Sequence, residues 1–309
     1  IRRTEMVGAS LNLGGQPLDL TEYSTTGLMA LAVGPRGFGK TNAGLLMAEQ
    51  LSEQGWVSVL IDPEGELESI YGAAVADADA LRQRLTLRDV PIVVVSAKDA
   101  LDFIPYGQVI LEVADELRKP LFVCIDEGQL FSAARKRADG VGEACDIIAQ
   151  FAERGRKRAL DLFVTALRYT GTLHRTMFSN SNLKLVGAQE DPTAWSALAP
   201  MFRSSGIEFK DLNALGPGEF VLFSRRGIEK TKMPMAEGLK KVAPKAKTVK
   251  RILPATFSQW DRAMREITTE RLEALTDPVV SLLGAVAGLV PQQMLAGARA
   301  LGDELEARA

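Results

Sequence analysis

One stretch of this chain has residue types and a spacing that suit the binding of a nucleoside triphosphate. It reads Gly34-Pro35-Arg36-Gly37-Phe38-Gly39-Lys40-Thr41, which fits the pattern G-x-x-x-x-G-K-[ST], and Asn42 follows it. The glycines leave backbone N–H groups free to converge on phosphate oxygens, Lys40 reaches the outer phosphates and the Thr41 hydroxyl holds Mg²⁺. We therefore predict that residues 34–42 bind the phosphates and that Thr41 is a ligand of the metal ion.

The segments on either side of this stretch are those that a phosphate-binding loop requires. The apolar run at residues 28–33 predicts a strand that ends at the loop, and residues 42–54 predict a helix that begins there. The free N–H groups and the dipole of that helix add to the attraction for phosphate. The loop is thus expected in the setting in which it binds a triphosphate.

Predicted strands and helices alternate along the first 236 residues. Strands that are apolar on both faces, with helices between them, predict an α/β fold whose mainly parallel sheet is covered by helices. Right-handed crossovers then place the ligand at the carboxyl ends of the strands. The further predicted strands are residues 56–61, 91–95, 121–125, 162–166, 183–186 and 219–224, and the further predicted helices are residues 78–85, 109–118, 141–153 and 192–202.

Two adjacent carboxylates follow the predicted strand at residues 121–125. Asp126 can hold Mg²⁺ together with Thr41, and Glu127 can take a proton from an attacking water as general base. Such a pair is typical of hydrolysis rather than of transfer to a second substrate; the alternative is an acidic strand end without a catalytic role. The chain has no N-K-x-D run, which would indicate guanine specificity, so ATP is the expected nucleotide.

A group of basic residues lies just before the predicted strand at residues 162–166. Four of five consecutive positions are basic: Arg154, Arg156, Lys157 and Arg158. Because a planar guanidinium contacts two phosphate oxygens at once, one of these arginines can act on a γ-phosphate. The alternative is a solvated basic helix end that interacts favourably with the helix dipole. Residue chemistry alone leaves both readings open.

Composition and charge exclude several classes of protein. The formal net charge of −2 excludes a strongly basic nucleic-acid-binding protein, although a local basic channel is compatible with it. The two cysteines, Cys124 and Cys145, lie in a strand-like and a helical segment and indicate a reducing compartment, so a cytoplasmic location is expected. No run reaches the ~18 apolar residues of a membrane-spanning helix, and no span is expected. The first residues, from Ile1 on, lack the order of a signal peptide.

A change in composition near residue 236 divides the chain. Six basic residues and no acidic ones occur between residues 240 and 251, and helical patterns resume beyond Pro254. We expect an ATPase domain at residues 1–236, a basic linker at 237–254 and a C-terminal helical segment at 255–309. The basic stretch favours a solvated linker; the alternative is a lining for a DNA path, which would contact phosphates without regard to base sequence.

The order and combination of the motifs resemble the HerA/FtsK superfamily of P-loop ATPases, most closely its HerA branch. The resemblance covers roughly residues 28–225. The motifs that carry it are residues 34–41, Asp62-Pro63-Glu64-Gly65-Glu66, Ile125-Asp126-Glu127, Arg154-Gly155-Arg156-Lys157 and Leu167-Arg168-Tyr169.

This resemblance implies a RecA-like P-loop NTPase core that assembles with copies of itself into a ring, a hexamer in the pattern of the family, and moves double-stranded DNA through the centre. A nuclease or another effector is the implied partner. ATP and Mg²⁺ then bind between neighbouring subunits. The implied roles are phosphate binding for Lys40 and Thr41, metal binding for Asp126, water activation for Glu127, a finger acting on the neighbouring subunit for Arg156 or Arg154, and a sensor of the nucleotide for Arg168.

The chain departs from the family pattern at the end of the fifth predicted strand. Members of the family commonly carry a Thr-Gln-Arg-Pro-like run there, whereas this chain has Ala166-Leu167-Arg168-Tyr169. Because leucine cannot hydrogen-bond a γ-phosphate or a water, Leu167 favours an alternative function, an ATP-gated assembly scaffold with slow hydrolysis. A conjugation- or secretion-type ATPase is a third possibility. Only about 28 residues precede the first predicted strand, so the N-terminal barrel of HerA proteins is not expected.

Overall fold

The computed structural model describes residues 9–134, 139–169 and 171–242. The C-terminal helical segment predicted at residues 255–309 lies outside the described residues, as does most of the basic linker predicted at 237–254. The first residues of that linker, Glu237–Val242, form the short helix α9.

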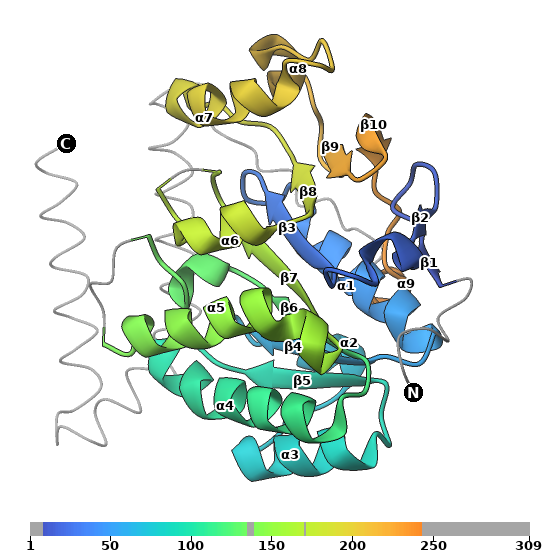
Figure 1. Ribbon diagram of the computed structural model, residues 1–309, viewed down its shortest axis with the longest axis vertical. Helices are drawn as coiled ribbons and strands as arrows, with labels where there is room; N and C mark the ends of the chain where they lie inside the picture. Colours follow the sequence, from blue (N-terminus) through green and yellow to red (C-terminus); the bar gives the residue numbers. More distant parts are fainter. Residues whose placement is uncertain (1–8, 135–138, 170, 243–309) are drawn as a thin grey trace, which may run out of the picture. The chain divides into compact units, whose positions relative to one another are not determined.

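An eight-stranded sheet in the order β10-β9-β8-β3-β7-β6-β4-β5 forms the centre of the described part of the chain (Figure 1). The strands from β8 to β5 in that order are all parallel, and β9 runs antiparallel to both of its neighbours. The predicted α/β fold with a mainly parallel sheet is thus confirmed. The strands are β3 (Met29–Val33), β4 (Val57–Asp62), β5 (Ile92–Ser96), β6 (Leu121–Ile125), β7 (Leu160–Ala166), β8 (Leu183–Val186), β9 (Glu219–Ser224) and β10 (Gly227–Lys232).

Helices cover both faces of the sheet. Side chains alternate between the faces along β3, where Leu31 packs into one core cluster and Ala30 and Ala32 into the other. Helices α4 and α5 pack on the first face, and α1 packs on the second with the short strands β1 (Ser10–Leu11) and β2 (Leu18–Asp19). The helices are α1 (Lys40–Glu53), α2 (Glu68–Tyr71), α3 (Ala78–Leu87), α4 (Ala100–Leu117), α5 (Val141–Arg158), α6 (Arg175–Asn180), α7 (Pro192–Phe202), α8 (Phe209–Asn213) and α9.

The helix that follows the phosphate loop lies unusually close to the sheet. A Cβ atom built on Gly44 of α1 would lie 2.6 Å from Cys124 Sγ and 2.8 Å from the ring of Phe163. Only glycine leaves room for this approach, since real Cβ atoms keep a larger distance from other heavy atoms. Gly44 therefore lets α1 settle against β6 and β7, the strands whose carboxyl ends carry the acidic pair and its neighbours.

A buried carboxylate joins three strands at the opposite, amino edge of the sheet. Asp161 in β7 is 4% exposed. Its Oδ1 accepts from the backbone N–H of Leu28, 2.8 Å away, and its Oδ2 accepts from Trp56 Nε1 at 3.0 Å. Leu28 leads into β3 and Trp56 leads into β4, so one side chain ties the starts of these strands to β7.

The sequence-based prediction missed several elements. Helix α4 begins at Ala100, not at residue 109, because Pro105 and Gly107 obscure a helical pattern whose start is capped by Asp99, which accepts from Asp102 N. Strand β10 was not predicted because its charged residues suit an exposed sheet edge rather than a buried strand. Within the described residues, every helix is too short or too polar to cross a lipid bilayer.

Candidate functional site

The phosphate loop connects β3 to α1 in the conformation that its glycines allow. Gly37 and Gly39 have φ values of 71° and 92°, a region that residues with a Cβ atom rarely adopt. The Nζ of Lys40 donates to the carbonyl oxygens of Gly34 and Pro35, each 2.9 Å away. The lysine thus lies across its own loop, with its charged end held by backbone oxygens near the start of the loop.

The aromatic residue of the loop anchors it to the neighbouring strands. Phe38 is 7% exposed, and its ring meets that of Phe220 edge to face at a centroid distance of 5.8 Å. A Cβ atom at Gly187, just after β8, would lie 2.6 Å from the Phe38 ring. The loop is therefore held in place by the packing of Phe38 against β8 and β9.

Burial makes the charge of the Lys40 ammonium costly. Desolvation lowers the pKa of the Lys40 ammonium, although Asp126 and Glu127 act in the opposite direction and raise it. A bound triphosphate would add negative charge directly beside this ammonium. The site is therefore built so that binding of phosphate relieves an unfavourable buried charge.

Asp126 is hydrogen-bonded both to the phosphate loop and to the neighbouring strand β7. Its Oδ2 accepts from the Thr41 hydroxyl at 2.8 Å, and its Oδ1 accepts from the Thr165 hydroxyl at 2.6 Å. Hydroxyl and carboxylate oxygens are the hard ligands that Mg²⁺ prefers, so the donor set fits this ion. The sequence predicted Thr41 and Asp126 as ligands of the metal ion but did not predict a role for Thr165. The only indication of Thr165 was that it is the polar residue in the otherwise apolar run at residues 162–166.

Glu127 occupies a tight turn immediately after Asp126. Its φ and ψ of 46° and 47° are left-handed, which is unfavourable for a residue with a long side chain. Its N–H donates to Thr165 Oγ1 at 2.9 Å, and a Cβ atom on the following Gly128 would lie 2.3 Å from Val164. Packing against β7 thus imposes a strained backbone turn directly after Asp126.

A cleft of about 420 Å³ opens beside the phosphate loop. Arg168 and Leu167, both singled out from the sequence, line it together with Pro35 of the loop. Arg168 Nη1 lies 4.0 Å from Asp191 Oδ2, a loose ion pair that leaves the guanidinium exposed. Sequence reasoning missed the opposite wall, Ala188, Gln189, Glu190 and Asp191, because only the strand order brings it to the loop.

The basic group before β7 lies at the other edge of the sheet. Arg154 and Arg156 belong to the last turns of α5, but their side chains lie outside what the structure describes. Helix α5 ends where β7 begins, whereas the phosphate loop adjoins the end of β7, about 20 Å further along a strand of this length. Arg158 of the same group is held by Asp115, with Nε–Oδ1 and Nη2–Oδ2 distances of 2.5 and 2.6 Å. An arginine at position 154 or 156 is thus placed far from its own phosphate loop.

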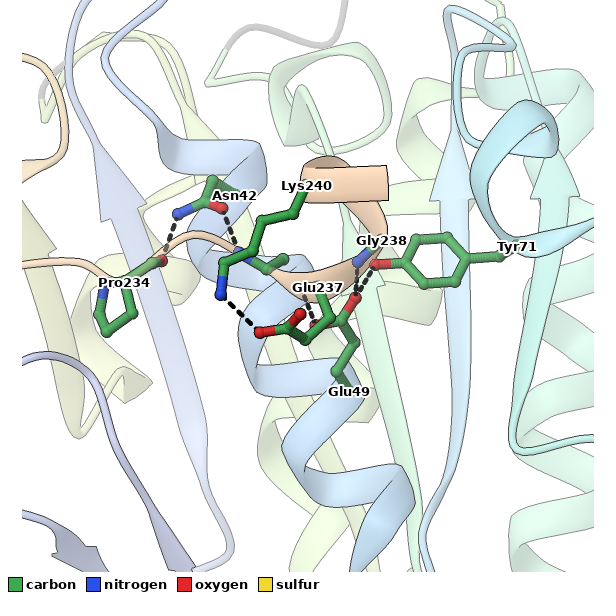
Figure 2. A network of polar contacts seen from close by, with 8 residues as sticks. Asn42, Glu49, Tyr71, Pro234, Glu237, Gly238 and Lys240 are labelled. Atoms are coloured by element: carbon green, nitrogen blue, oxygen red, sulfur yellow. Dashed lines mark hydrogen bonds and ion pairs between the residues drawn. The ribbon is translucent and has the colours of Figure 1, made fainter. Parts of the chain in front are cut away.

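The chain after β10 crosses the phosphate-loop helix as a strap, residues 233–242. Asn42, the residue after Thr41, makes two hydrogen bonds to the strap. Its Nδ2 donates to Pro234 O (Figure 2) and its Oδ1 accepts from Ala236 N, each at 2.8 Å. Two turns further along α1, Glu49 accepts from the N–H groups of Glu237 and Gly238 at 2.7 and 2.8 Å. The strap is therefore hydrogen-bonded to α1 at two places, Asn42 and Glu49.

Tyr71 of α2 completes the attachment of the strap. Its hydroxyl donates to Glu49 Oε1 at 2.6 Å (Figure 2), and burial beside that carboxylate raises the pKa of Tyr71. A Cβ atom on Gly238 would lie 2.5 Å from Ile70 and 2.8 Å from the Tyr71 hydroxyl. Helix α9 therefore sits directly against α1 and α2.

We expect Glu49→Ala to loosen the strap without unfolding the sheet. The substitution leaves the N–H groups of Glu237 and Gly238 without their acceptor, a cost of about 1–3 kcal/mol. Amide hydrogen exchange at these two residues should accelerate about tenfold or more. The matched control is Glu53→Ala, which removes an exposed carboxylate from the same helix; equal exchange in the two variants would contradict a role for Glu49 in holding the strap.

Comparison with known proteins bears on the fold. Neither a protein-family model nor a curated protein sequence matches this chain. Among solved structures, the genome packaging NTPase B204 from Sulfolobus turreted icosahedral virus 2 in complex with ATP-gammaS is similar, with a TM-score of 0.53, 14% identity, and coverage of 68% of this chain and 99% of B204. VirB4 of Thermoanaerobacter pseudethanolicus is also similar, with a TM-score of 0.55, 11% identity, and coverage of 74% of this chain and 98% of VirB4.

The chain has the fold of a P-loop NTPase. The likeness extends over nearly the whole of both neighbours, and it confirms the RecA-like architecture expected from the HerA/FtsK resemblance. The shared fold accounts for the position of the loop, Asp126 and Glu127 at one edge of the sheet, because parallel strands end together at that edge.

Proposed function

We propose that this chain is an ATP-hydrolysing, ring-forming motor of HerA/FtsK type that moves or remodels double-stranded DNA. The observation that carries the hydrolytic part is the link from Thr41 through Asp126 to Thr165. It joins the phosphate loop to the end of β6, which Glu127 follows, and to β7. A fold shared with a packaging NTPase solved with ATP-gammaS supports the choice of nucleotide.

The side chains of the site have separable roles in the proposed reaction. The loop at residues 34–42 binds the phosphates through its backbone N–H groups from Arg36 on and through Lys40, and orients the outer phosphoryl group. Thr41 and Asp126 would hold Mg²⁺, which when bound neutralises charge on the phosphate oxygens. Arg168, which lines the cleft with Pro35, is the proposed sensor of that group.

Glu127 is the proposed general base. It takes a proton from a water whose oxygen forms a bond to the γ-phosphorus, while the bond from this phosphorus to the β–γ bridging oxygen breaks and its electron pair stays on that oxygen. The products are ADP and inorganic phosphate. The left-handed turn at Glu127 supports this role, since strain of this kind persists where a side chain must be aimed.

The position of Arg154 and Arg156 supports a ring. Because both lie at the sheet edge away from their own phosphate loop, a contact with a γ-phosphate has to be made in a neighbouring subunit. Six such subunits, as the resemblance implies, would place each arginine group at the nucleotide of the next. A nuclease or another effector is the proposed partner of the ring, and a cytoplasmic location remains part of the proposal.

Particle mass and DNA-dependent turnover together test the motor. We expect the chain to form a ring with ATP, and duplex DNA to raise its rate of ATP hydrolysis by about fivefold or more, as a coupling of 1 kcal/mol or above requires. Subunits with Arg156→Ala mixed with subunits with Glu127→Gln should recover part of the activity, since intact sites form at mixed interfaces. A monomer with ATP and DNA present, or no recovery at any mixing ratio, would contradict the ring mechanism.

One observation favours a second function, an ATP-gated assembly scaffold. Leu167 lines the cleft at the place where the family pattern has a polar residue. A site without that group would hydrolyse ATP slowly and serve mainly to hold a partner. Turnover that is indifferent to duplex DNA, in a ring that still binds its partner, would support the scaffold over the motor.

A further inference from the structure

A glutamine lies two residues after the proposed general base, in a segment whose backbone is held in place. Gln129 is the middle residue of a short turn of 3₁₀ helix, Gly128–Leu130, which directly follows Glu127. The N–H of Leu130 donates to Glu127 O at 2.8 Å, and Phe131, the next residue, is fully buried. The backbone at Gln129 is therefore fixed by contacts that do not involve its own side chain.

One end of the Gln129 side chain faces the carboxylate of Glu127. Its Nε2 lies 3.4 Å from Glu127 Oε2. Because a carboxylate oxygen only accepts hydrogen bonds, the amide nitrogen is the end that must face it. A distance of 3.4 Å is long for a hydrogen bond, and the hydrogen bonds of catalytic groups commonly shorten when the substrate binds. The amide is thus a donor to the group that takes the proton in the proposed reaction.

The other end of the same amide has no partner. Gln129 Oε1 is shielded from solvent and accepts no hydrogen bond within the described part of the chain. Burial of a carbonyl oxygen without a donor is unfavourable, so an apolar side chain of similar length would suit this position better if packing were its only role. The contact of the nitrogen with Glu127 accounts for a polar residue here, since functional sites commonly carry such a cost to stability.

We propose that Gln129 is a positioning residue for Glu127. Its amide N–H donates to Glu127 Oε2 and holds the carboxylate in one orientation, in which the other oxygen, Oε1, takes the proton of the attacking water. The left-handed backbone at Glu127 restrains the start of this side chain, and the amide restrains its end. The inference rests on the proposed ATP hydrolysis and deepens it, because it names a residue that acts through the general base.

A variant of matched length separates turnover from stability. Gln129→Met removes the amide together with its unpartnered oxygen. We expect single-turnover hydrolysis of ATP to slow about 10–100-fold, with the Kd for ATP changed by less than about threefold. Because an unsatisfied buried oxygen is lost, the urea midpoint of unfolding should stay the same or rise. The control is Gln108→Met, on the exposed face of α4, where the amide donates to Glu143 at 3.0 Å and turnover should be unchanged.

A double variant shows whether Gln129 acts through Glu127. A residue that only orients the general base has nothing to orient once the base is replaced, so its own substitution should then have no further effect. We therefore expect the double variant Glu127→Gln, Gln129→Met to hydrolyse ATP at the rate of Glu127→Gln alone. A role of Gln129 that does not depend on Glu127 would instead lower the rate again by the factor seen in the single variant.

Gln129→Glu tests the same contact by charge. The carboxylate that it introduces has the size of the amide but disfavours ionisation of Glu127 beside it. Since the general base acts in its ionised form, we expect the acid limb of the rate–pH profile to move to higher pH by about one unit. The charges of Lys40 and Asp126 also act at this site and are the same in every variant. Gln108→Glu, which places a charge beside its own carboxylate partner, should leave the acid limb unmoved.

Several results would overturn the inference. Turnover of Gln129→Met at the rate of the unmodified chain would show that the amide does not orient the base, and a Kd that rises as much as turnover falls would make Gln129 a binding residue. Unfolding of Gln129→Met at lower urea, with an unmoved acid limb in Gln129→Glu, would make its role structural. Failure of the unmodified chain itself to hydrolyse ATP would instead refute the proposed function, and with it this inference.

Discussion

Replacing Glu127 with glutamine is expected to stop ATP turnover while ATP still binds. The amide cannot take a proton from water, and removal of a general base slows a reaction by about 10²–10⁴-fold. Binding should persist because the phosphate loop, Lys40 and the Thr41–Asp126 pair are untouched. Single-turnover hydrolysis and the Kd for ATP, measured on the same preparation, check the two halves of this expectation.

A second carboxylate, in the cleft beside the phosphate loop, provides the control for Glu127. Glu190 lines the cleft from the end of β8 and is exposed. Glu190→Gln makes the same chemical change at the alternative position, and it should hydrolyse ATP close to the rate of the unmodified chain. If Glu190→Gln lost turnover while Glu127→Gln kept it, Glu190 and not Glu127 would be the general base.

Asp161→Ala is expected to have the largest effect on stability. The substitution leaves two buried donors, Leu28 N–H and Trp56 Nε1–H, without acceptors at the starts of β3 and β4. Each unsatisfied buried donor costs about 1–3 kcal/mol, so the free energy of unfolding should fall by about 2–6 kcal/mol. Urea denaturation followed by circular dichroism and by tryptophan fluorescence, to which Trp56 contributes, measures this change.

Asp19→Ala removes a carboxylate of the same type from the surface and serves as the comparison. Asp19 caps a single short turn, where its Oδ1 accepts from Thr21 N at 2.8 Å, so its loss should cost about 0.5–2 kcal/mol. If Asp161→Ala unfolds at the same urea concentration as Asp19→Ala, the hydrogen bonds of Asp161 do not hold the starts of β3 and β4 to β7. Asp161→Asn, which keeps one acceptor, should fall between the unmodified chain and Asp161→Ala.

Much of the site was predictable because it depends on neighbours in the sequence. The phosphate loop is contiguous, and the strand before it and the helix after it are themselves local patterns. Asp126 and Glu127 follow directly from an apolar strand, for the same reason. The helix predicted at residues 192–202 agrees with α7 at both ends, since Asp191 caps it and Pro192 begins it.

The elements that were not predicted lack such local signals. Helix α9 is a polar turn whose start is satisfied by Glu49, a residue far away in the sequence. The buried state of Asp161 is likewise invisible in the sequence, because an acidic residue in a strand is ordinarily placed at the surface. Its partners lie 133 and 105 positions away along the chain.

The sequence by itself determined that a strand, a phosphate-binding loop and a helix follow one another, and that an acidic pair ends a later strand. Only the tertiary structure decided which side chains meet there. Thr165 reaches Asp126 because β7 pairs with β6, and Gln189 reaches the cleft because β8 pairs with β3 on the other side of the loop. Strand order depends on packing between distant segments, so residues that complete the site are set by the fold and not by the motif.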